Sequence, residues 1–197
     1  MAANAQGTSS GPARVWSDVM ETPTLTKQQI VFTVGSTVTI DAPADKVFDI
    51  IMSFDKYGEW NTWCPKFEFK DGERPEVGST GTMHVNMEAQ NRQYEIPAEI
   101  LELEYEPQQY KLSWRGKLLP AWAGKAERVQ IVTPVEGSNN QQSQLKQWES
   151  MSGFASYVFK HIMGIPKQLA DSNALYSNDI KKHAEKLQGS ISTSASV

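Results

Sequence analysis

The chain has 197 residues, of which 39% are hydrophobic and 21% are charged, and this balance predicts one globular domain with a sizeable core. A formal net charge of -4 without a basic cluster argues against a nucleic-acid-binding protein. The single cysteine, Cys64, excludes an internal disulfide, and no apolar run approaches the about 20 residues that span a bilayer. We therefore expect a cytoplasmic protein without a transmembrane segment.

Both ends of the chain are predicted to be flexible tails. Residues 1–27 are rich in Ala, Ser, Thr, Gly and Pro and contain few large apolar side chains. Trp16 is one of these few, and an alternative is that it folds back over the mouth of a pocket. At the other end, Gly189 is expected to stop the last helix, so residues 188–197 form the second tail. The folded domain is predicted to span residues 28–187.

The first folded segment is predicted to be a long strand followed by two short helices. Apolar residues alternate from Ile30 to Ile40, with Gly35 as a predicted bulge or bend. Asp41 is expected to cap the next helix, and Pro43 suits its first turn. In the second helix the aromatic residues recur at a spacing of three, as Phe54, Tyr57 and Trp60.

About six more strands and a long helix follow. A change of phase between Ile100 and Leu101 predicts a β-bulge, which would curve the sheet. From Phe154 onward the apolar spacing changes to three, four or seven residues, which is typical of an amphipathic helix. Gly164 and Pro166 are expected to kink or interrupt that helix.

Four short motifs carry a resemblance to a known superfamily. They are APADKVF at 42–48, YGEWN at 57–61, YKLSW at 110–114 and ESMSG at 149–153. With the order of elements over about residues 28 to 187, they resemble the Bet v 1-like, START-related SRPBCC superfamily and its polyketide cyclase/dehydrase and lipid-transport group. The resemblance implies an α+β helix-grip fold. In that fold a curved antiparallel sheet of six to seven strands wraps around a long C-terminal helix and encloses a hydrophobic cavity.

The candidate catalytic residues lie mainly on one predicted hairpin. If its turn is centred near Ser138, antiparallel register places Glu127 opposite Glu149 and Val129 opposite Gln147. Two carboxylates in an apolar cavity cannot both ionise cheaply, so one becomes a proton donor beside a base. In one alternative Lys125 neutralises one of them. In another, a register slip of one residue turns both glutamates to solvent.

Three other residues are candidates for chemistry or ligand contact. His161 shares the apolar stripe of the last helix, where it is either a proton relay or a hydrogen-bonded core residue. Tyr94 is in phase with Ile96 and offers a hydroxyl that orients a carbonyl. Trp114 offers a flat wall for stacking. Ordinary core packing is the alternative for both aromatic residues.

The remaining candidates for ligand contact share an expected position that faces the cavity or lies near its entrance. They are Met83, Leu112, Lys125, Gln147, Met151, Tyr157 and Val158, together with the loop at 61–65. Cys64 has no neighbouring base that would make it a nucleophile, and the scattered histidines show no metal-ligand spacing.

Two functions fit these observations. The first is a cofactor-independent enzyme of secondary metabolism, resembling polyketide cyclases and dehydratases and acting as a lyase or isomerase through Glu127, Glu149, Tyr94 or His161. The second is a non-catalytic carrier or chaperone of a lipid, sterol or quinone, in which the polar groups anchor a headgroup. A third, a protein-binding co-chaperone, needs an exposed apolar groove. The in-phase carboxylates favour the enzyme, and we expect a monomer or homodimer without cofactor or metal.

Overall fold

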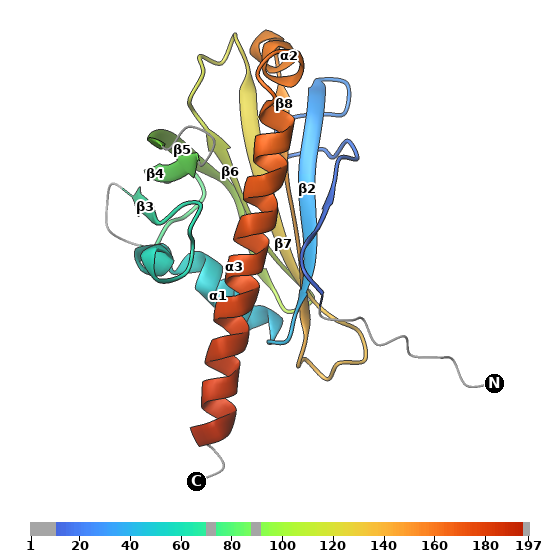
Figure 1. The fold of residues 1–197 in the computed structure, drawn as a ribbon, viewed down its shortest axis with the longest axis vertical. Coiled ribbons are helices and arrows are strands. Elements are labelled where there is room, and N and C mark those ends of the chain that lie inside the picture. The colour runs from blue at the N-terminus through green and yellow to red at the C-terminus, as the bar shows by residue number, and fades with distance from the viewer. Residues whose placement is uncertain (1–10, 70–73, 88–91, 195–197) are drawn as a thin grey trace, which may run out of the picture.

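The computed structural model describes residues 11–69, 74–87 and 92–194. In these residues one antiparallel sheet of eight strands has the order β1-β2-β8-β7-β6-β5-β4-β3. Figure 1 shows the sheet curving around the long helix α3, which confirms the helix-grip architecture, with more strands than the six to seven expected. The strands are β1 (Arg14–Trp16), β2 (Ile30–Ile40), β3 (Lys66–Phe69), β4 (Thr80–Met87), β5 (Arg92–Glu106), β6 (Gln109–Gly116), β7 (Lys125–Pro134) and β8 (Ser143–Ser152).

The helices are α1 (Ala44–Met52), the 3-10 helix η1 (Phe54–Glu59), α2 (Phe154–His161) and α3 (Ile165–Ser194). The predicted interruption of the C-terminal helix is confirmed, because Gly164 separates α2 from α3 with a φ of 63°. Two helix-end predictions are wrong. Gly189 does not stop α3, since one glycine costs a helix only about 1 kcal/mol. Pro43, not Asp41, occupies the N-cap of α1, and the Asp41 carboxylate accepts a hydrogen bond from Gln142 instead.

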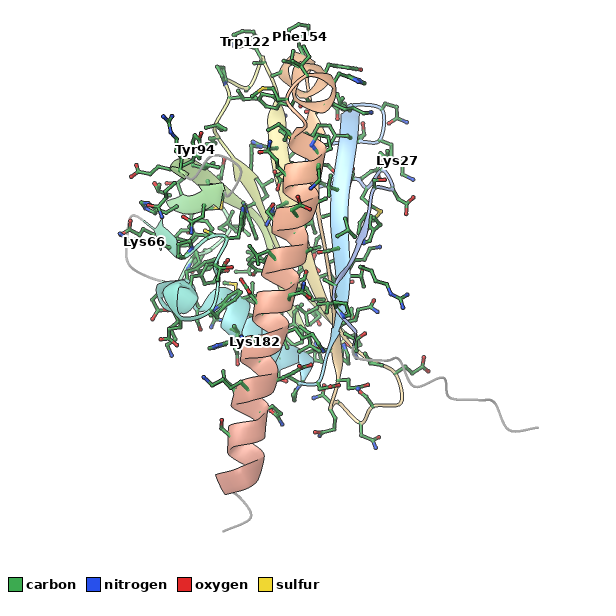
Figure 2. All side chains as sticks on the ribbon, viewed as in Figure 1. Lys27, Lys66, Tyr94, Trp122, Phe154 and Lys182 are labelled. Atoms are coloured by element: carbon green, nitrogen blue, oxygen red, sulfur yellow. The ribbon has the colours of Figure 1, made fainter. Side chains whose placement is uncertain are left out.

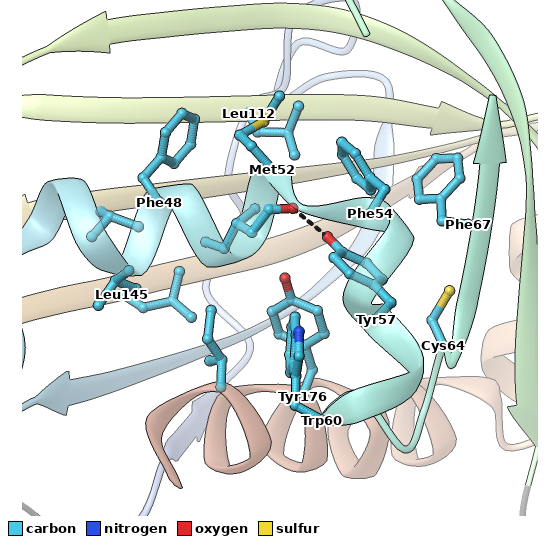
Figure 3. Packing of buried hydrophobic residues seen from close by; sticks show 14 of the residues in the cluster. Phe48, Met52, Phe54, Tyr57, Trp60, Cys64, Phe67, Leu112, Leu145 and Tyr176 are labelled. Carbon is cyan, nitrogen blue, oxygen red and sulfur yellow. Dashed lines mark hydrogen bonds between the residues drawn. The ribbon is translucent and has the colours of Figure 1, made fainter. Parts of the chain in front are cut away.

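Aromatic side chains from α1, η1 and α3 fill one end of the space between sheet and helix. Phe54 packs edge-on against Phe67 with their ring centres 5.0 Å apart. The Tyr57 hydroxyl donates a hydrogen bond of 2.7 Å to the carbonyl oxygen of Ile51, drawn as a dashed line in Figure 3. Tyr176 of α3 is 1% exposed and packs edge-on against Trp60, with their ring centres 5.3 Å apart (Figure 3). This end is therefore solid core, and the open space lies nearer the other end of α3.

A buried polar seam holds α3 on the sheet. The Nε2 group of Gln147 donates to the Ser177 hydroxyl at 2.9 Å and to the Asn173 carbonyl at 3.0 Å, and both partners lie on α3. Its Oε1 accepts a hydrogen bond of 2.9 Å from Gln130 on β7. Ser36 of β2 also bonds to Ser177, at 2.9 Å. These contacts fix the rotation and height of α3, because each buried group loses its partner if the helix shifts.

Residues 17–29 cross the outer face of the sheet as an ordered strap, so the prediction that residues 1–27 are a flexible tail is wrong from residue 11 onward. Trp148 Nε1 donates to the Glu21 carbonyl at 3.0 Å, and the Ser150 hydroxyl donates to the Met20 carbonyl at 2.6 Å. Leu25 is 2% exposed. Residues 1–10 lie outside the described part of the chain. The strap gives β7 and β8 a second buried face, which the sequence did not predict.

β1 and Gly35 correct two further expectations. Trp16 of β1 packs on the outer face against Gly35, where an added Cβ would lie 2.3 Å from the indole ring. Trp16 therefore does not cover a pocket mouth. The register shift of β2 lies between Ile30 and Phe32 rather than at Gly35, whereas the predicted bulge of β5 is confirmed between Ile100 and Glu102.

The strap is held by the fully buried Glu127 carboxylate. It accepts hydrogen bonds from the Thr22 hydroxyl at 2.7 Å, the Thr24 amide at 3.1 Å and the Thr24 hydroxyl. Arg115 adds two donors, from Nε at 2.9 Å and Nη2 at 2.8 Å. Burial pushes the pKa of Glu127 upward, but the hydrogen bonds from Thr24, Thr22 and Arg115 outweigh it, so the pKa lies below its ordinary value of 4.5.

Glu127→Gln is expected to lower the free energy of unfolding by about 2–3 kcal/mol near neutral pH, because Arg115 loses its carboxylate partner. A carboxylate with a lowered folded-state pKa stabilises the fold above its unfolded-state pKa, and the stabilisation disappears as the pH falls through the folded-state pKa. The difference between wild type and variant should therefore be constant above about pH 4.5 and shrink below it. Urea unfolding across this pH range measures it.

The matched control is Asp171→Asn, which breaks the exposed ion pair with Lys167. It is expected to change the free energy of unfolding by less than about 1 kcal/mol. A Glu127→Gln effect no larger than this would contradict the role assigned to the strap contacts.

Candidate functional site

A cavity of about 290 Å³ lies between the sheet and the region where α2 meets α3. Most of its walls are apolar. Among the described residues that line it, the charged ones are Arg128 of β7 and Glu149 of β8. The lining consists of Trp63, Met83, Val85, Tyr94, Ile96, Trp114, Gly116, Leu118, Leu119, Ala126, Arg128, Glu149, Met151, Phe159, Met163, Ile165 and Leu169. A mostly apolar space with a few polar groups is typical of a small-molecule site.

Arg128 and Glu149 form an ion pair at the cavity wall. They lie directly opposite each other in the β7–β8 register, and Arg128 donates from Nε at 3.1 Å and from Nη2 at 2.7 Å to the same Glu149 oxygen, Oε2. Arg128 is 1% exposed, and the Glu149 side chain is 15% exposed. The guanidinium carbon lies 4.2 Å from the Trp63 ring centre and 5.9 Å from that of Trp114. The two indoles therefore help to stabilise a buried cation.

One nitrogen of Arg128 has no partner. Nη1 is buried and makes no hydrogen bond to any residue in the described part of the chain. Buried donors are almost always paired, and an unpaired one costs roughly 1–3 kcal/mol. Arg128 therefore presents an unmet requirement for a hydrogen-bond acceptor beside an apolar cavity.

The loop that carries Trp63 is fixed from two sides. Thr62 donates from its amide at 3.0 Å and from its hydroxyl at 2.6 Å to Asp179 Oδ2 on α3. The amide of Asn86 on β4 donates to the Trp63 carbonyl at 2.7 Å. The loop at 61–65, expected to be close to a ligand, thus brings Trp63 into the cavity wall.

The predicted register of the β7–β8 hairpin is wrong by one residue. Glu127 lies opposite Ser150, and Val129 lies opposite Trp148, not Gln147. The loop at 135–142 has an even number of residues, so its centre falls between Ser138 and Asn139. Glu127 consequently faces the strap and not the cavity, and the expected Glu127–Glu149 pair does not form.

Several other candidates lie away from the cavity. His161 is exposed at the end of α2, because the break at 162–164 interrupts the apolar stripe that would have turned it inward. Tyr157 is 56% exposed, for the same reason. Outside the lining as well are Leu112, which belongs to the solid core, Gln147, which holds α3, and Lys125 and Val158.

The structure brings five of the predicted residues together around the cavity. They are Glu149, Tyr94, Trp114, Met83 and Met151. The prediction missed Arg128. Its position two residues from both Ala126 and Gln130 places these three residues on one face of β7, and this spacing could have indicated it. It also missed Leu119, Phe159, Ile165 and Leu169, which close the cavity from the loop at 117–124 and from the helices.

Other buried groups are less suited to chemistry. Burial raises the pKa of the Cys64 thiol to about 12, so this thiol stays protonated at neutral pH. Burial likewise raises the pKa of Tyr176 to about 12. A larger groove of about 810 Å³ lies outside the fold between η1 and β3, but its lining includes Asp49, Asp55 and Glu68, as expected of solvated surface.

A comparison with protein families identifies the family of this chain. The model of the family described as "Polyketide cyclase / dehydrase and lipid transport" matches residues 31–157. The chain belongs to this family. The matched part of the chain runs from β2 through β8 into α2, and it includes both Arg128 and Glu149.

Individual relatives are distant. "Oxopyrrolidines biosynthesis cluster protein O" of Penicillium oxalicum is 24% identical over 168 residues, covering 74% of this chain and 83% of the relative. Human StAR-related lipid transfer protein 5 has a TM-score of 0.66 at 10% identity, covering 93% of this chain and 90% of that one. The di-domain ARO/CYC StfQ of the steffimycin biosynthetic pathway has a TM-score of 0.61 at 12% identity, covering 83% and 53%. These structural likenesses show a shared fold.

Replacing Arg128 alone by Met is expected to lower the free energy of unfolding by about 3–5 kcal/mol, because Glu149 is then left as an unpaired charge in the cavity wall. The double variant Arg128→Met/Glu149→Gln should be more stable than the single variant, since no unpaired charge remains. Urea unfolding of wild type, both single variants and the double variant gives the coupling energy. Strictly additive effects would contradict a direct interaction between the two side chains.

Proposed function

We propose that this protein binds a compact hydrophobic molecule with a carbonyl or carboxylate oxygen and acts on it in the manner of a polyketide cyclase or dehydratase, without a cofactor. The observation that carries the proposal is the buried, unpartnered Nη1 of Arg128, a residue that lines an apolar cavity. A ligand oxygen that accepts its hydrogen bond removes the penalty of the unpaired donor. The family match and the relative from a biosynthetic cluster support a place in secondary metabolism.

The size of the cavity favours a compact ligand. Its volume of about 290 Å³ is at the lower end of the roughly 300–1,000 Å³ that is usual for small-molecule pockets. One or two fused rings fit such a space better than a phospholipid with two acyl chains. The flat walls supplied by Trp63 and Trp114 are suited to stacking on rings.

The Arg128–Glu149 pair offers both groups that enolisation requires. A hydrogen bond from Arg128 polarises a carbonyl and stabilises the enolate oxygen, and this effect is strong in a site without water. Glu149 Oε2 accepts both bonds from Arg128, and Oε1 makes no hydrogen bond within the described residues. In the proposed mechanism Oε1 takes a proton from the carbon next to the carbonyl. Tyr94, also in the lining, orients the substrate.

A non-catalytic carrier is the second candidate. The observation that favours it is that the two charged groups of the lining already neutralise each other, which leaves mainly apolar walls. In a carrier, Arg128 anchors the polar end of the ligand and no bond is made or broken.

Two probes of similar size, 2-acetylnaphthalene and 2-ethylnaphthalene, test the role of Arg128, because a CH2 group in the second replaces the carbonyl group of the first. We expect wild type to bind the ketone at least about tenfold more tightly, because a hydrogen bond to a charged donor contributes about 1.5–3 kcal/mol. The double variant Arg128→Met/Glu149→Gln should lose this preference and still bind the hydrocarbon. Quenching of tryptophan fluorescence measures both affinities, and Glu185→Gln on α3 is the control. Equal affinity of wild type for both probes would remove the proposal.

Exchange of the methyl protons of 2-acetylnaphthalene in heavy water distinguishes the enzyme from the carrier. If Glu149 is the base, wild type accelerates the exchange, and Glu149→Gln abolishes the acceleration while it retains binding. Binding by wild type without any acceleration favours the carrier. Mass spectrometry of the recovered ketone gives the rate.

A further inference from the structure

The end of the molecule at the cavity exposes an unusual group of large apolar side chains. Trp122 is 85% exposed, Ile162 78% and Phe154 75%. Figure 2 labels Trp122 and Phe154 close together at the same end of the fold, beyond the tips of the strands. We call the whole group the apolar rim, and its members are Leu118, Trp122, Phe154, Tyr157, Ile162 and Met163. Within the described residues it contains six of the eleven exposed large hydrophobic side chains.

The apolar rim is continuous with the cavity. Leu118 and Met163 line the cavity and are at the same time 58% and 49% exposed. The two segments that form the rim are joined, because the Ala155 amide donates to the Ala123 carbonyl at 2.9 Å. The rim therefore surrounds the mouth of the cavity and is not a set of scattered surface residues, which would need no explanation.

The charge around the rim is opposite in sign to that of the whole chain. The chain has 19 Lys and Arg against 23 Asp and Glu. In contrast, residues 117–126 and 153–170 contain four lysines and no acidic residue. Lys117 pairs with Glu99, and Lys167 pairs with Asp171, from outside these segments. Lys125 and Lys160 form no ion pair within the described part of the chain, and their charge is available to an anionic partner.

We propose that the apolar rim docks this protein onto an anionic phospholipid membrane. Protruding tryptophan, phenylalanine and isoleucine side chains are suited to the boundary between headgroups and acyl chains. Lysines beside them are attracted to lipid phosphates and to phosphatidylserine. None of the helices in the described ranges is long and apolar enough to cross a membrane, so the contact is peripheral. Docking in this orientation turns the cavity mouth toward the bilayer, where a hydrophobic ligand dissolves.

The same charges argue against a second copy as the occupant. Two apolar rims facing each other would bring the lysines of both copies together without an acidic residue between them. An anionic membrane can contact both the apolar side chains and the lysines of the rim. A neutral apolar groove on another protein would contact the apolar side chains but would leave the lysines without a partner.

Flotation with vesicles tests the proposal on the full chain. Wild type is expected to float with vesicles of phosphatidylcholine and phosphatidylserine, and more weakly with phosphatidylcholine alone or at high salt. Trp122→Ser/Phe154→Ser should reduce the partition coefficient by about tenfold or more, because two interfacial anchors are removed. Both side chains are largely exposed, so the fold is retained, which circular dichroism checks.

Matched controls remove the same kinds of side chain at other places. Val77→Ser/Leu187→Ser removes two exposed apolar side chains outside the rim and should float like wild type. Lys125→Gln/Lys160→Gln should lose the preference for phosphatidylserine, whereas Lys182→Gln/Lys186→Gln near the other end of α3 should keep it. Arg128→Met/Glu149→Gln should float normally, so that docking is tested independently of ligand binding.

Three results would overturn the proposal. The first is a flotation result: either wild type does not float with the vesicles, or Trp122→Ser/Phe154→Ser floats as well as wild type. The second is self-association of wild type that the rim substitutions abolish in sedimentation velocity without vesicles, which would assign the rim to a second copy. The third is binding to soluble polyglutamate as tight as binding to vesicles, which would assign the rim to an acidic protein.

Discussion

The position of α3 on the sheet is set by the buried Gln147 amide, and the cavity depends on that position. Apolar contacts alone are non-directional and would tolerate a shift of the helix, whereas Gln147 requires Ser177 and the Asn173 carbonyl at particular places. On one side of this seam the aromatic residues of α1 and η1 fill the space completely. On the other side the helix surface offers Leu169 and Ile165, which line the cavity together with Arg128 and do not fill it. The seam thus divides the interior into a core and a cavity.

The order of the elements could be predicted from the sequence because it depends on local patterns. Alternating apolar residues define β2 to β8, the spacing of three and four defines α3, and Gly164 breaks the helix where expected. The strap could not be predicted in this way. Residues 17–29 contain few apolar side chains, and they are ordered by distant hydrogen bonds to Trp148, Ser150 and Glu127. No local periodicity reports such contacts.

The error in the site follows from the error in the strap. Because the strap covers the outer face, β7 and β8 are buried on both faces, and alternation then no longer tells which face points inward. Val129 and Glu127 are buried, yet they belong to the outer face. Glu149, Tyr94 and Trp114 were identified because the prediction assigned their strands to the correct face. Arg128 was missed because the prediction assigned Glu127 and Val129 to the inner face of β7, which places Arg128 on the outer face.

The arrangement of polarity along the cavity constrains what it can bind. Arg128 is 1% exposed, whereas Leu118 and Met163 at the mouth are 58% and 49% exposed, so polarity lies deep and the apolar surface lies outside. A ligand bound as proposed enters with its oxygen first and must lose the water bound to that oxygen before it reaches Nη1. The hydrogen bond from a charged donor offsets this cost for one oxygen but not for several. The cavity should therefore select molecules that carry oxygen at one end and an apolar body at the other, and such molecules partition into membranes. If the cavity mouth faces a bilayer, such molecules can enter the cavity directly from the membrane. This explains why the apolar rim surrounds the mouth.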